Sequence, residues 1–419
     1  MSAAFFPRRD GVLCCDDVPL PDLVARWGTP LYVYSARAIE ERFRELDEAL
    51  SPVPRLIAYS VKANGNLGIL RALAALGAGA DIVSGGELDR ALRAGFPAER
   101  ILFSGVGKTV TELAAALEAG IYGFNVESEG ELRTLSELCA ATGRVARIAL
   151  RVNPNVEALT PHAYTRTGHA ATKFGVPIED APRLYRLARE LPGLDVRGVD
   201  VHIGSQILEV SPYQRAVAQV LDLIAVLKDD GADLEYLDVG GGLGISYTGE
   251  EGITAAHFAG AVLPAVREAG LRLVVEPGRY IVGPAGVLLT RVLYVKDGGG
   301  KRFVITDAGM NDLLRPSHYS GYHAVEPVWS SGREAARVDI VGPICETGDF
   351  LALDRDLEMP EPGELLAVHT VGAYGFSMSS TYNQRPRPAE VMVRGAEAQL
   401  VRRRETFDDL VAAELGTSP

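Results

Sequence analysis

The sequence contains little of what membrane, secreted and nucleic-acid-binding proteins require. No run of apolar residues approaches the ~18 that a membrane span needs. The start, MSAAFFPRRDG, lacks the apolar core and cleavage site of a signal peptide. Acidic residues outnumber basic ones, 55 against 42, so the net charge is −13. Because nucleic acids and anionic membranes select for basic patches, this balance argues against both as partners.

Disulfide and metal-binding patterns are also missing from the sequence. The four cysteines, Cys14, Cys15, Cys139 and Cys345, fit neither the spacing of a zinc site nor a disulfide framework. The seven histidines are scattered and form no HExxH-type pair. We therefore expect no metal site and a reducing, cytoplasmic location.

What the chain does contain, between Arg55 and Glu276, is a regular alternation of strand-like and helical stretches. Its 419 residues are enough for two domains with a large core. Eight runs have strand character: LIAYS at 56, ADIVS at 80, ILFSG at 101, GFNVES at 123, RIALRVN at 147, VRGVDVHIGS at 196, YLDVGGG at 236 and LRLVVEPG at 271. Amphipathic stretches such as NLGILRALAALG separate most of them. This count predicts a (β/α)8 TIM-like barrel of the α/β class; an open, doubly wound sheet is the alternative.

The pattern changes after Gly283, where strand-like runs follow one another without helices between them. Examples are GVLLTRVLYVKD, KRFVITDAG and AARVDIVGPIC. They predict a mainly antiparallel β domain, which the early strand-like segment GTPLYVYS is expected to join. We therefore expect a barrel over residues 36–283, and a β domain made of residues 1–35 and 284–419 with a short terminal helix.

Polar residues gather where the predicted barrel strands end. In such barrels functional groups lie at the C-terminal ends of the strands. The strand ends here read Lys62, Asp81 to Ser84, Ser104, Asn125 to Ser128, Asn153, His202 to Gln206, Gly240 to Gly242 and Glu276 to Arg279. A barrel with a purely structural role would not need this polarity.

Lys62 ends the apolar run LIAYSV and is followed at once by Asn64, Gly65 and Asn66. The simplest interpretation is a solvated strand end, because lysine is mostly exposed. The other is a lysine in a barrel mouth, where desolvation can lower its pKa and make it a Schiff-base nucleophile.

Three other strand ends carry complementary chemistry. The run Gly240, Gly241, Gly242 exposes backbone N–H groups that suit a phosphate, although a tight turn would also explain it. His202 could stack on a flat ring or be a core histidine. Glu276 could meet a protonated ring nitrogen or pair with Arg279. With an amine-reactive lysine, these groups describe a pyridoxal 5′-phosphate (PLP) site.

The same residues carry a family resemblance over most of the chain. The motifs YSVKANGN, DIVSGGEL, FNVESEGEL, ATKFGV, HIGSQI, DVGGGLG, EPGRY, DAGMNDLLRPSHY, GPICETGD and GAYGFSMSSTYNQRPRPAEV resemble those of fold-type III PLP-dependent decarboxylases, and within them the diaminopimelate decarboxylase family. The resemblance implies an alanine-racemase-like barrel with a β domain, a homodimer with active sites at the interface, and decarboxylation of meso-2,6-diaminopimelate to L-lysine.

The resemblance also implies roles for single residues. Lys62 would hold PLP and Cys345 would donate a proton. The remaining cofactor contacts would be Asp81, His202, Ser205, Gly240, Gly241, Gly242, Glu276, Gly278, Arg279 and Tyr374. The substrate contacts would be Arg279, Arg315, Tyr319, Glu346 and Tyr374. As a bare residue, Cys345 would more often be a buried structural thiol. Arg315 could be a solvated surface arginine and Tyr374 a core tyrosine. The motif context reverses all three interpretations.

Departures from the family pattern are small, and they leave alternatives for the substrate. Ser60 stands where alanine is common, and Ser317, His318 and Thr347 stand where the family more often has Ala, Leu and Ser. A decarboxylase of ornithine, arginine, carboxynorspermidine or a carrier-linked amino acid is one alternative. A non-catalytic homologue is a second. An amino-acid racemase is a third, and it would need another acid/base on the opposite ring face.

Overall fold

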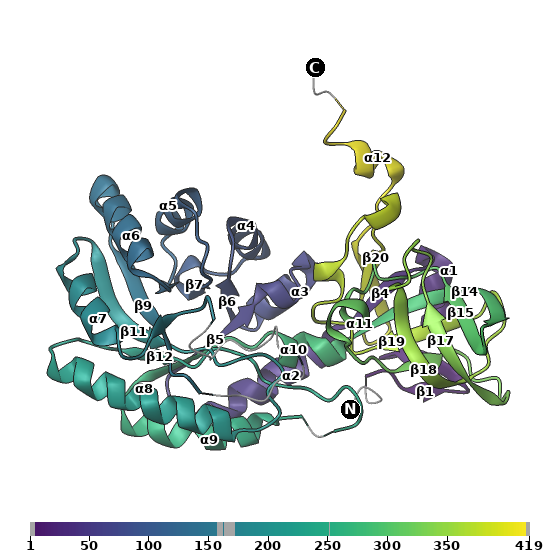
Figure 1. Ribbon diagram of the computed structural model, residues 1–419, viewed down its shortest axis with the longest axis horizontal. Coiled ribbons are helices and arrows are strands. Elements are labelled where there is room, and N and C mark those ends of the chain that lie inside the picture. Colours follow the sequence, from purple (N-terminus) through teal and green to yellow (C-terminus); the bar gives the residue numbers. More distant parts are fainter. Residues whose placement is uncertain (1–4, 157–161, 163–171, 251, 416–419) are drawn as a thin grey trace. The chain divides into compact units, whose positions relative to one another are not determined.

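The computed structural model describes residues 5–156, 162, 172–250 and 252–415. The chain divides into two compact units (Figure 1). The barrel unit comprises Arg42–Ile245 and Glu251–Tyr280, and the β unit comprises Met1–Glu41, Ser246–Glu250 and Ile281–Pro419. Within the described residues, no helix is both long and apolar enough to cross a membrane.

The barrel unit is built on eight parallel strands that close on themselves. Their hydrogen-bonded order is β9-β11-β12-β13-β5-β6-β7-β8, and β8 pairs back with β9. Their bounds are β5 (Arg55–Ser60), β6 (Gly79–Ile82), β7 (Ile101–Phe103), β8 (Gly123–Val126), β9 (Ala146–Asn153), β11 (Leu194–Asp200), β12 (Tyr236–Asp238) and β13 (Arg272–Val275), with the short β10 (Val176–Pro177) beside β9. All eight predicted strands are present. Closure confirms the predicted (β/α)8 barrel and excludes the open sheet.

Helices surround the barrel strands (Figure 1). They are α2 (Ala36–Ala49), α3 (Leu67–Ala75), α4 (Gly85–Ala94), α5 (Val110–Ala119), α6 (Glu129–Thr142), α7 (Ala181–Glu190), α8 (Ser211–Asp229), α9 (Ala255–Glu268) and α10 (Arg279–Val282). Ser84 caps α4 by accepting the N–H of Glu87. Ser128 caps α6 in the same way through Glu131. Such a cap contributes about 1 kcal/mol, so the serine and glutamate of DIVSGGEL and NVESEGEL have a local structural role.

An apolar cluster fills part of the barrel interior. Its buried members are Leu56, Ala58, Leu102, Ala149, Tyr236 and Val274. The Tyr236 ring needs the glycine at position 198, because a Cβ there would lie 2.3 Å from it. The interior is therefore packed and is not an open channel, which leaves the polar strand ends as the place for chemistry.

The β unit is one mixed, mainly antiparallel sheet. Its hydrogen-bonded order is β18-β17-β15-β14-β4-β20-β21, with β19 on β14 and β16 on β19. The strands are β4 (Leu31–Ser35), β14 (Gly286–Gly298), β15 (Lys301–Thr306), β16 (Val325–Pro327), β17 (Ala335–Val341), β18 (Phe350–Glu358), β19 (Leu365–His369), β20 (Ala389–Arg394) and β21 (Glu397–Arg402). Two contacts, β15 with β17 and β20 with β4, are parallel. The predicted architecture is confirmed.

The N-terminal strand β4 lies inside this sheet, between β14 and β20. All five of its residues are buried. The prediction that GTPLYVYS joins the β domain is therefore confirmed. Smaller elements of the unit are β1 (Arg8–Arg9), β2 (Val12–Cys15) and β3 (Val18–Pro19), which form a separate sheet, and the helices α1 (Leu20–Trp27), α11 (Arg315–Tyr319) and α12 (Phe407–Val411).

Candidate functional site

Lys62 lies just after β5, in the 3₁₀ segment Val61–Ala63. Its Nζ is 2.8 Å from Asp81 Oδ2, and 34% of its side chain is exposed. Ser60 Oγ donates to the same Asp81 oxygen at 2.9 Å. The other oxygen, Asp81 Oδ1, is buried and has no hydrogen-bond partner among the described residues. The lysine is thus neither a solvated strand end nor fully desolvated, but an ion-paired cation at the barrel mouth.

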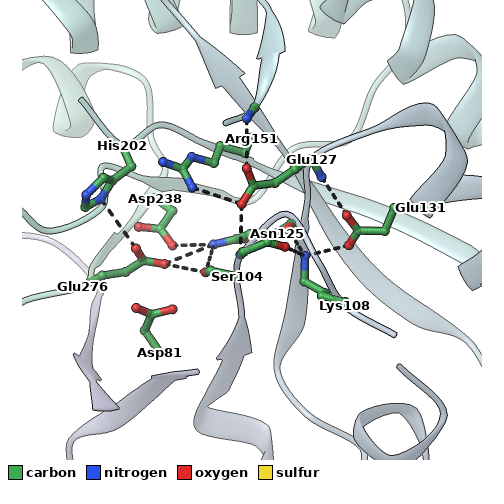
Figure 2. Close-up of polar contacts among 12 residues, drawn as sticks. Asp81, Ser104, Lys108, Asn125, Glu127, Glu131, Arg151, His202, Asp238 and Glu276 are labelled. Carbon is green, nitrogen blue, oxygen red and sulfur yellow. Dashed lines mark hydrogen bonds and ion pairs between the residues drawn. The ribbon is translucent and has the colours of Figure 1, made fainter. Parts of the chain in front are cut away.

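Glu276 follows β13 and is 4% exposed. Its Oε1 accepts from Ser104 Oγ at 3.0 Å and from Asn125 Nδ2 at 3.2 Å (Figure 2). Its Oε2 lies 3.9 Å from Nδ1 of His202. Burial raises the pKa of Glu276 to about 7, and the Asp81 carboxylate adds to the effect. One oxygen of Glu276 therefore accepts hydrogen bonds from Ser104 and Asn125, and the other faces His202.

Two further acids, Asp200 at the end of β11 and Asp238 at the end of β12, lie beside Glu276. The three are buried, and ligand atoms from them lie within 4.8 Å of one another. Burial raises the pKa of Asp200 and of Asp238 well above its usual value, with the Glu276 charge as the next cause. Like charges this close cannot all ionise, so the cluster holds protons at neutral pH.

Arg151, on β9, supplies positive charge next to this cluster. Its Nη1 donates to Glu127 Oε1 at 3.0 Å, and both side chains are buried. Glu127 also accepts backbone N–H groups from Gly105 and Gly175, each at 2.9 Å. The pair therefore satisfies its own charges while fixing two loops above the strand ends. Removing either partner alone would leave a buried charge without compensation.

Lys108 forms a second buried ion pair, with Glu131 at 2.7 Å. The same Nζ donates to the carbonyl oxygens of Asn125 at 2.7 Å and Gly105 at 2.8 Å (Figure 2). The Lys108–Glu131 pair therefore fixes the backbone of β8 at Asn125.

His202 follows β11 and is about one-sixth exposed, at 17% of its side chain. Its Nδ1 accepts the N–H of Gly241 at 3.1 Å, which requires an unprotonated nitrogen. Burial lowers the pKa of His202 well below its usual value, and the positive charges of Arg151 and Lys62 add to this. The ring is therefore neutral, which suits stacking on a flat ring better than a core ion pair.

The glycine run after β12 is more constrained than the sequence suggested. The N–H of Gly240 donates to Asp238 Oδ1 at 2.9 Å, and that of Gly241 goes to the histidine. Gly240 and Gly242 have φ of 68° and 87°. A Cβ at Gly241 would lie 2.0 Å from the carbonyl oxygen of Glu276. Two of the three N–H groups thus have internal acceptors, and the glycines are required first for close packing.

Arg279 begins α10 and is 8% exposed. Its Nη2 donates to Ser205 Oγ at 3.2 Å, which joins the segment after β13 to the loop after β11. Gly278 permits a close approach on the other side, because a Cβ there would lie 2.9 Å from Ala63 Cβ. Of the predicted cofactor contacts, Gly278 therefore lies against the lysine segment, and Arg279 next to it binds Ser205.

In the β unit, Arg315 is held on two sides. Its Nη1 lies 2.8 Å from His323 Nε2, and its guanidinium lies 4.7 Å from the centre of the Tyr247 ring. His323 Nδ1 lies 2.8 Å from the carbonyl oxygen of His369. Because arginine can only donate, Nε2 accepts and Nδ1 carries the proton, so His323 is a neutral ring. Arg315 is 8% exposed, which excludes a solvated surface arginine.

Cys345 lies in the loop after β17 and is exposed, which excludes a buried structural thiol. Its N–H donates to Asn383 Oδ1 at 3.0 Å. The buried Asp349 shapes this loop by accepting the N–H groups of Ile344 and Met310, both at 2.6 Å. The thiol is thus presented by a backbone that a buried carboxylate organises.

Two other predicted substrate residues, Glu346 and Tyr374, also lie in the β unit. Glu346 is exposed and shares a hydrogen bond with Tyr382. Tyr374 is partly buried and adopts φ 57°, a conformation that is uncommon for a residue with a side chain. Such backbone strain often occurs at functional sites, and it argues against a purely core-packing role for Tyr374.

Helix α11 carries two of the four residues that depart from the family pattern, Ser317 and His318. Ser317 Oγ donates to the carbonyl oxygen of Gly348 at 2.6 Å, so it ties this helix to the Cys345 loop. His318 is exposed, and its ring meets the Tyr319 ring edge-on at 4.5 Å. The serine has a clear structural use here. The histidine changes the surroundings of a predicted substrate residue, Tyr319.

The sequence predicted the polar and charged residues at the strand ends. It did not predict several buried polar residues that lie beside the predicted site residues. In the barrel these are Arg151, Asp200 and Asp238. In the β unit they are His323 and Asp349. A signal existed for the barrel residues, because each is a charged side chain inside an otherwise apolar strand and needs a partner there. For His323 and Asp349 the local sequence gives none.

The barrel part of the chain matches a known family model. Residues 36–283 match "Pyridoxal-dependent decarboxylase, pyridoxal binding domain". Similar proteins include diaminopimelate decarboxylase of Aquifex aeolicus, 50% identical over 412 residues (98% of this chain and 97% of that protein). The diaminopimelate decarboxylase of Vibrio cholerae is 48% identical over 408 residues, which is 97% of each chain.

Solved structures agree with these sequence matches. Diaminopimelate decarboxylase of Helicobacter pylori, complexed with L-lysine, has a TM-score of 0.91 at 42% identity, over 94% of this chain and 99% of that one. The enzyme of M. jannaschii, also in complex with L-lysine, has a TM-score of 0.94 at 36% identity, over 100% and 99%. Matches this extensive, in both sequence and fold, show that the chain belongs to the pyridoxal-dependent decarboxylases and, among them, to the diaminopimelate decarboxylase family.

Proposed function

We propose that this protein removes carbon dioxide from meso-2,6-diaminopimelate to give L-lysine, with PLP as its cofactor. The proposal is carried by one observation: near 50% identity to diaminopimelate decarboxylases over almost the whole chain. The reaction would complete lysine biosynthesis. The geometry of the barrel mouth supports it, since lysine, neutral imidazole, glycine turn and acid come from β5, β11, β12 and β13 to one edge.

The residues of this edge fit PLP. A flat ring needs an uncharged stacking surface, and His202 is neutral. A ring nitrogen needs an acid with an available oxygen, and Glu276 keeps Oε2 on the side away from Ser104 and Asn125. The buried Asp81 Oδ1, without a hydrogen-bond partner in the described structure, is a further acceptor beside the lysine.

We assign the cofactor contacts accordingly. Lys62 would attach PLP covalently, and Asp81 would orient its amine. His202 would stack on the ring and Glu276 would meet the ring nitrogen. The phosphate would be held by Ser205, Gly278, Arg279 and the turn of Gly240, Gly241 and Gly242, in which the first two N–H groups already have internal acceptors. Tyr374 is assigned as a further cofactor contact. When bound, PLP accepts the electron pair that remains at Cα after carbon dioxide leaves.

The β unit supplies groups for the substrate. Diaminopimelate carries a carboxylate and an ammonium at its far end. The forked donors of Arg315, with Arg279, suit the carboxylate, and Glu346 suits the ammonium. Tyr319 and Tyr374 complete these contacts. Cys345 protonates Cα from its exposed thiol after the C–C bond breaks. Substrates without a distal carboxylate, such as ornithine, would have no use for Arg315.

We further propose that the protein is a homodimer with shared active sites. Cys345 and Glu346 are exposed on the single chain. A proton donor in such a reaction works best where water is excluded, so this loop is expected to be covered in the active protein. A two-fold dimer is the commonest closed assembly and would cover the same loop on both chains.

A substrate panel tests the function directly. Carbon dioxide release is measured for meso-diaminopimelate, ornithine, arginine and lysine with the PLP-loaded protein. We expect release from diaminopimelate alone at an appreciable rate. Turnover of ornithine or arginine in its place would reassign the substrate. A colourless protein that binds no PLP would support the non-catalytic alternative.

A further inference from the structure

The amide of Asn125 occupies the centre of the acid cluster. Its Nδ2 lies 3.2 Å from each of three oxygens: Ser104 Oγ, Asp238 Oδ2 and Glu276 Oε1 (Figure 2). The side chain is completely buried. Three acceptors around one atom require that atom to be the donor, so the nitrogen faces the acids. The amide has two hydrogens for these acceptors.

Ser104 acts on the same carboxylate oxygen. Its hydroxyl donates to Glu276 Oε1 at 3.0 Å and accepts a hydrogen bond from Asn125 Nδ2. Glu276 Oε1 therefore has two donors, and Oε2 is directed to the His202 side. Donors to a carboxylate favour its charged form. They also fix which of its two oxygens can meet another group.

The strand end that carries Asn125 is itself fixed. Lys108 binds the Asn125 carbonyl oxygen at 2.7 Å, and Glu131 binds Lys108. Asp238 accepts the Gly240 N–H on its other oxygen. The amide thus has little freedom to turn away from the acids, and its orientation is built into β8.

We propose that Asn125, assisted by Ser104, is a positioning residue that keeps Glu276 ionised and aims its Oε2 at the ring nitrogen of the cofactor. The proposal rests on the role assigned to Glu276 above. Without these donors the carboxylate would become a stronger base. The shared proton would then move from the ring nitrogen to Glu276, and the ring would withdraw electrons less strongly.

The test uses holoenzyme reconstituted with PLP labelled with ¹⁵N in the ring. The ¹⁵N chemical shift reports whether the ring nitrogen is protonated. Asn125→Leu removes the donor at nearly constant size, and Ser104→Ala removes the second donor. Ser136→Ala is the matched control, since its buried hydroxyl donates to Pro192 at 2.8 Å elsewhere in the barrel. Glu276→Gln tests the underlying assignment.

We expect Asn125→Leu and Ser104→Ala to move the ¹⁵N signal toward the unprotonated position, as Glu276→Gln does, and Ser136→Ala to leave it unchanged. The kcat of Asn125→Leu should fall roughly 10- to 100-fold, the effect of one hydrogen bond to a charged group. A wild-type signal in both donor variants, with a moved signal in Glu276→Gln, overturns this inference alone. A wild-type signal in Glu276→Gln overturns the role of Glu276 and the inference with it. If Asn125→Leu does not fold, Ser104→Ala decides.

Discussion

The two units of the molecule handle their polar groups in opposite ways. At the barrel mouth, Asp200, Asp238 and Glu276 are buried together, and amide, hydroxyl and backbone donors bind Asp238 and Glu276. In the β unit, Cys345 and Glu346 are exposed on a loop. The polar groups of the barrel mouth thus bind one another, whereas the loop of the β unit exposes Cys345 and Glu346 to solvent.

This difference separates two kinds of function. A buried, hydrogen-bonded network fixes protonation and orientation, which is what cofactor chemistry requires. The exposed loop, which the buried Asp349 organises, carries residues proposed for substrate recognition and for the dimer interface. If the comparison is right, changes in the barrel should affect the cofactor, and changes in the β unit should affect substrate recognition and assembly.

The largest effect is expected for Lys62→Ala, which removes the proposed attachment point of PLP. Borohydride reduction of the wild-type holoenzyme should fix the cofactor to the peptide that contains Lys62. The variant should show no such label, and its carbon dioxide release should fall to background. Label recovered on a different peptide would show that the barrel lysine has been assigned wrongly.

Arg315→Met should have the next largest effect. It removes one partner of a desolvated charge pair with the distal carboxylate, so about 2–5 kcal/mol of transition-state binding should be lost. The measurement is kcat/KM for meso-diaminopimelate, with the absorption spectrum of bound PLP as the control that the barrel is intact. An unchanged kcat/KM would remove Arg315 from the substrate site.

His323→Leu should act through Arg315. It takes away the acceptor of Arg315 Nη1, at a cost of roughly 1–3 kcal/mol, seen mainly as a higher KM. In an Arg315→Met background the same change should cost almost nothing more, because the pair acts as a unit. His323→Gln retains an acceptor and should restore part of the loss. Additive effects of the two changes would argue for a role of His323 in stability alone.

Two acids, one in each unit, should respond to pH in opposite ways. Burial raises the pKa of Glu276 to about 7, so its folded form binds a proton more tightly than the unfolded chain. Its contribution to stability is full below about 4.5 and is lost as pH rises through about 7. Hydrogen bonds from His369 and Arg8 lower the pKa of Glu326, in the β unit, to about 2. That contribution is present at neutral pH and is lost as pH falls from about 4.5 toward 2.

Thermal unfolding of the PLP-free protein between pH 3 and 8 measures both the loss of stability at acid pH and the loss near neutral pH. Glu276→Gln should reduce the loss of Tm above pH 6, and Glu326→Gln should reduce the loss below pH 4. The first change should be partial, because burial also raises the pKa of Glu87 and of Asp312 to about 7. Indistinguishable profiles for the two variants would contradict the opposite roles of Glu276 and Glu326.

The smallest signal is a recovery of activity between two defective variants. Lys62→Ala and Cys345→Ala are mixed, mildly dissociated and reassembled. If each site takes its lysine from one chain and its cysteine from the other, hybrid dimers contain one intact site. Random reassortment then restores about a quarter of all sites under two-fold symmetry. No recovery would mean that both residues come from the same chain.

Much of the barrel was open to prediction because its signals are local. Alternating apolar runs and helical spacing gave the eight strands, and Ser84 and Ser128 cap helices through residues only three positions away. The positions of Lys62, His202 and Glu276 followed from the rule that barrel strands present functional groups at their C-terminal ends. The lysine's ion pair with Asp81 needed the structure, since those residues lie on different strands.

The sequence by itself determined the order of strands and helices, the polar character of the strand ends and the family motifs, because each depends on residues close together in the chain. Only the tertiary structure decided which acids share a proton, which nitrogen of His202 and His323 accepts, and why Asn125 must present its amide nitrogen. These depend on distances between strands far apart in sequence, such as β8, β12 and β13. Hydrogen bonds act over about 3 Å, so chain closure, and not local pattern, sets the chemistry of the site.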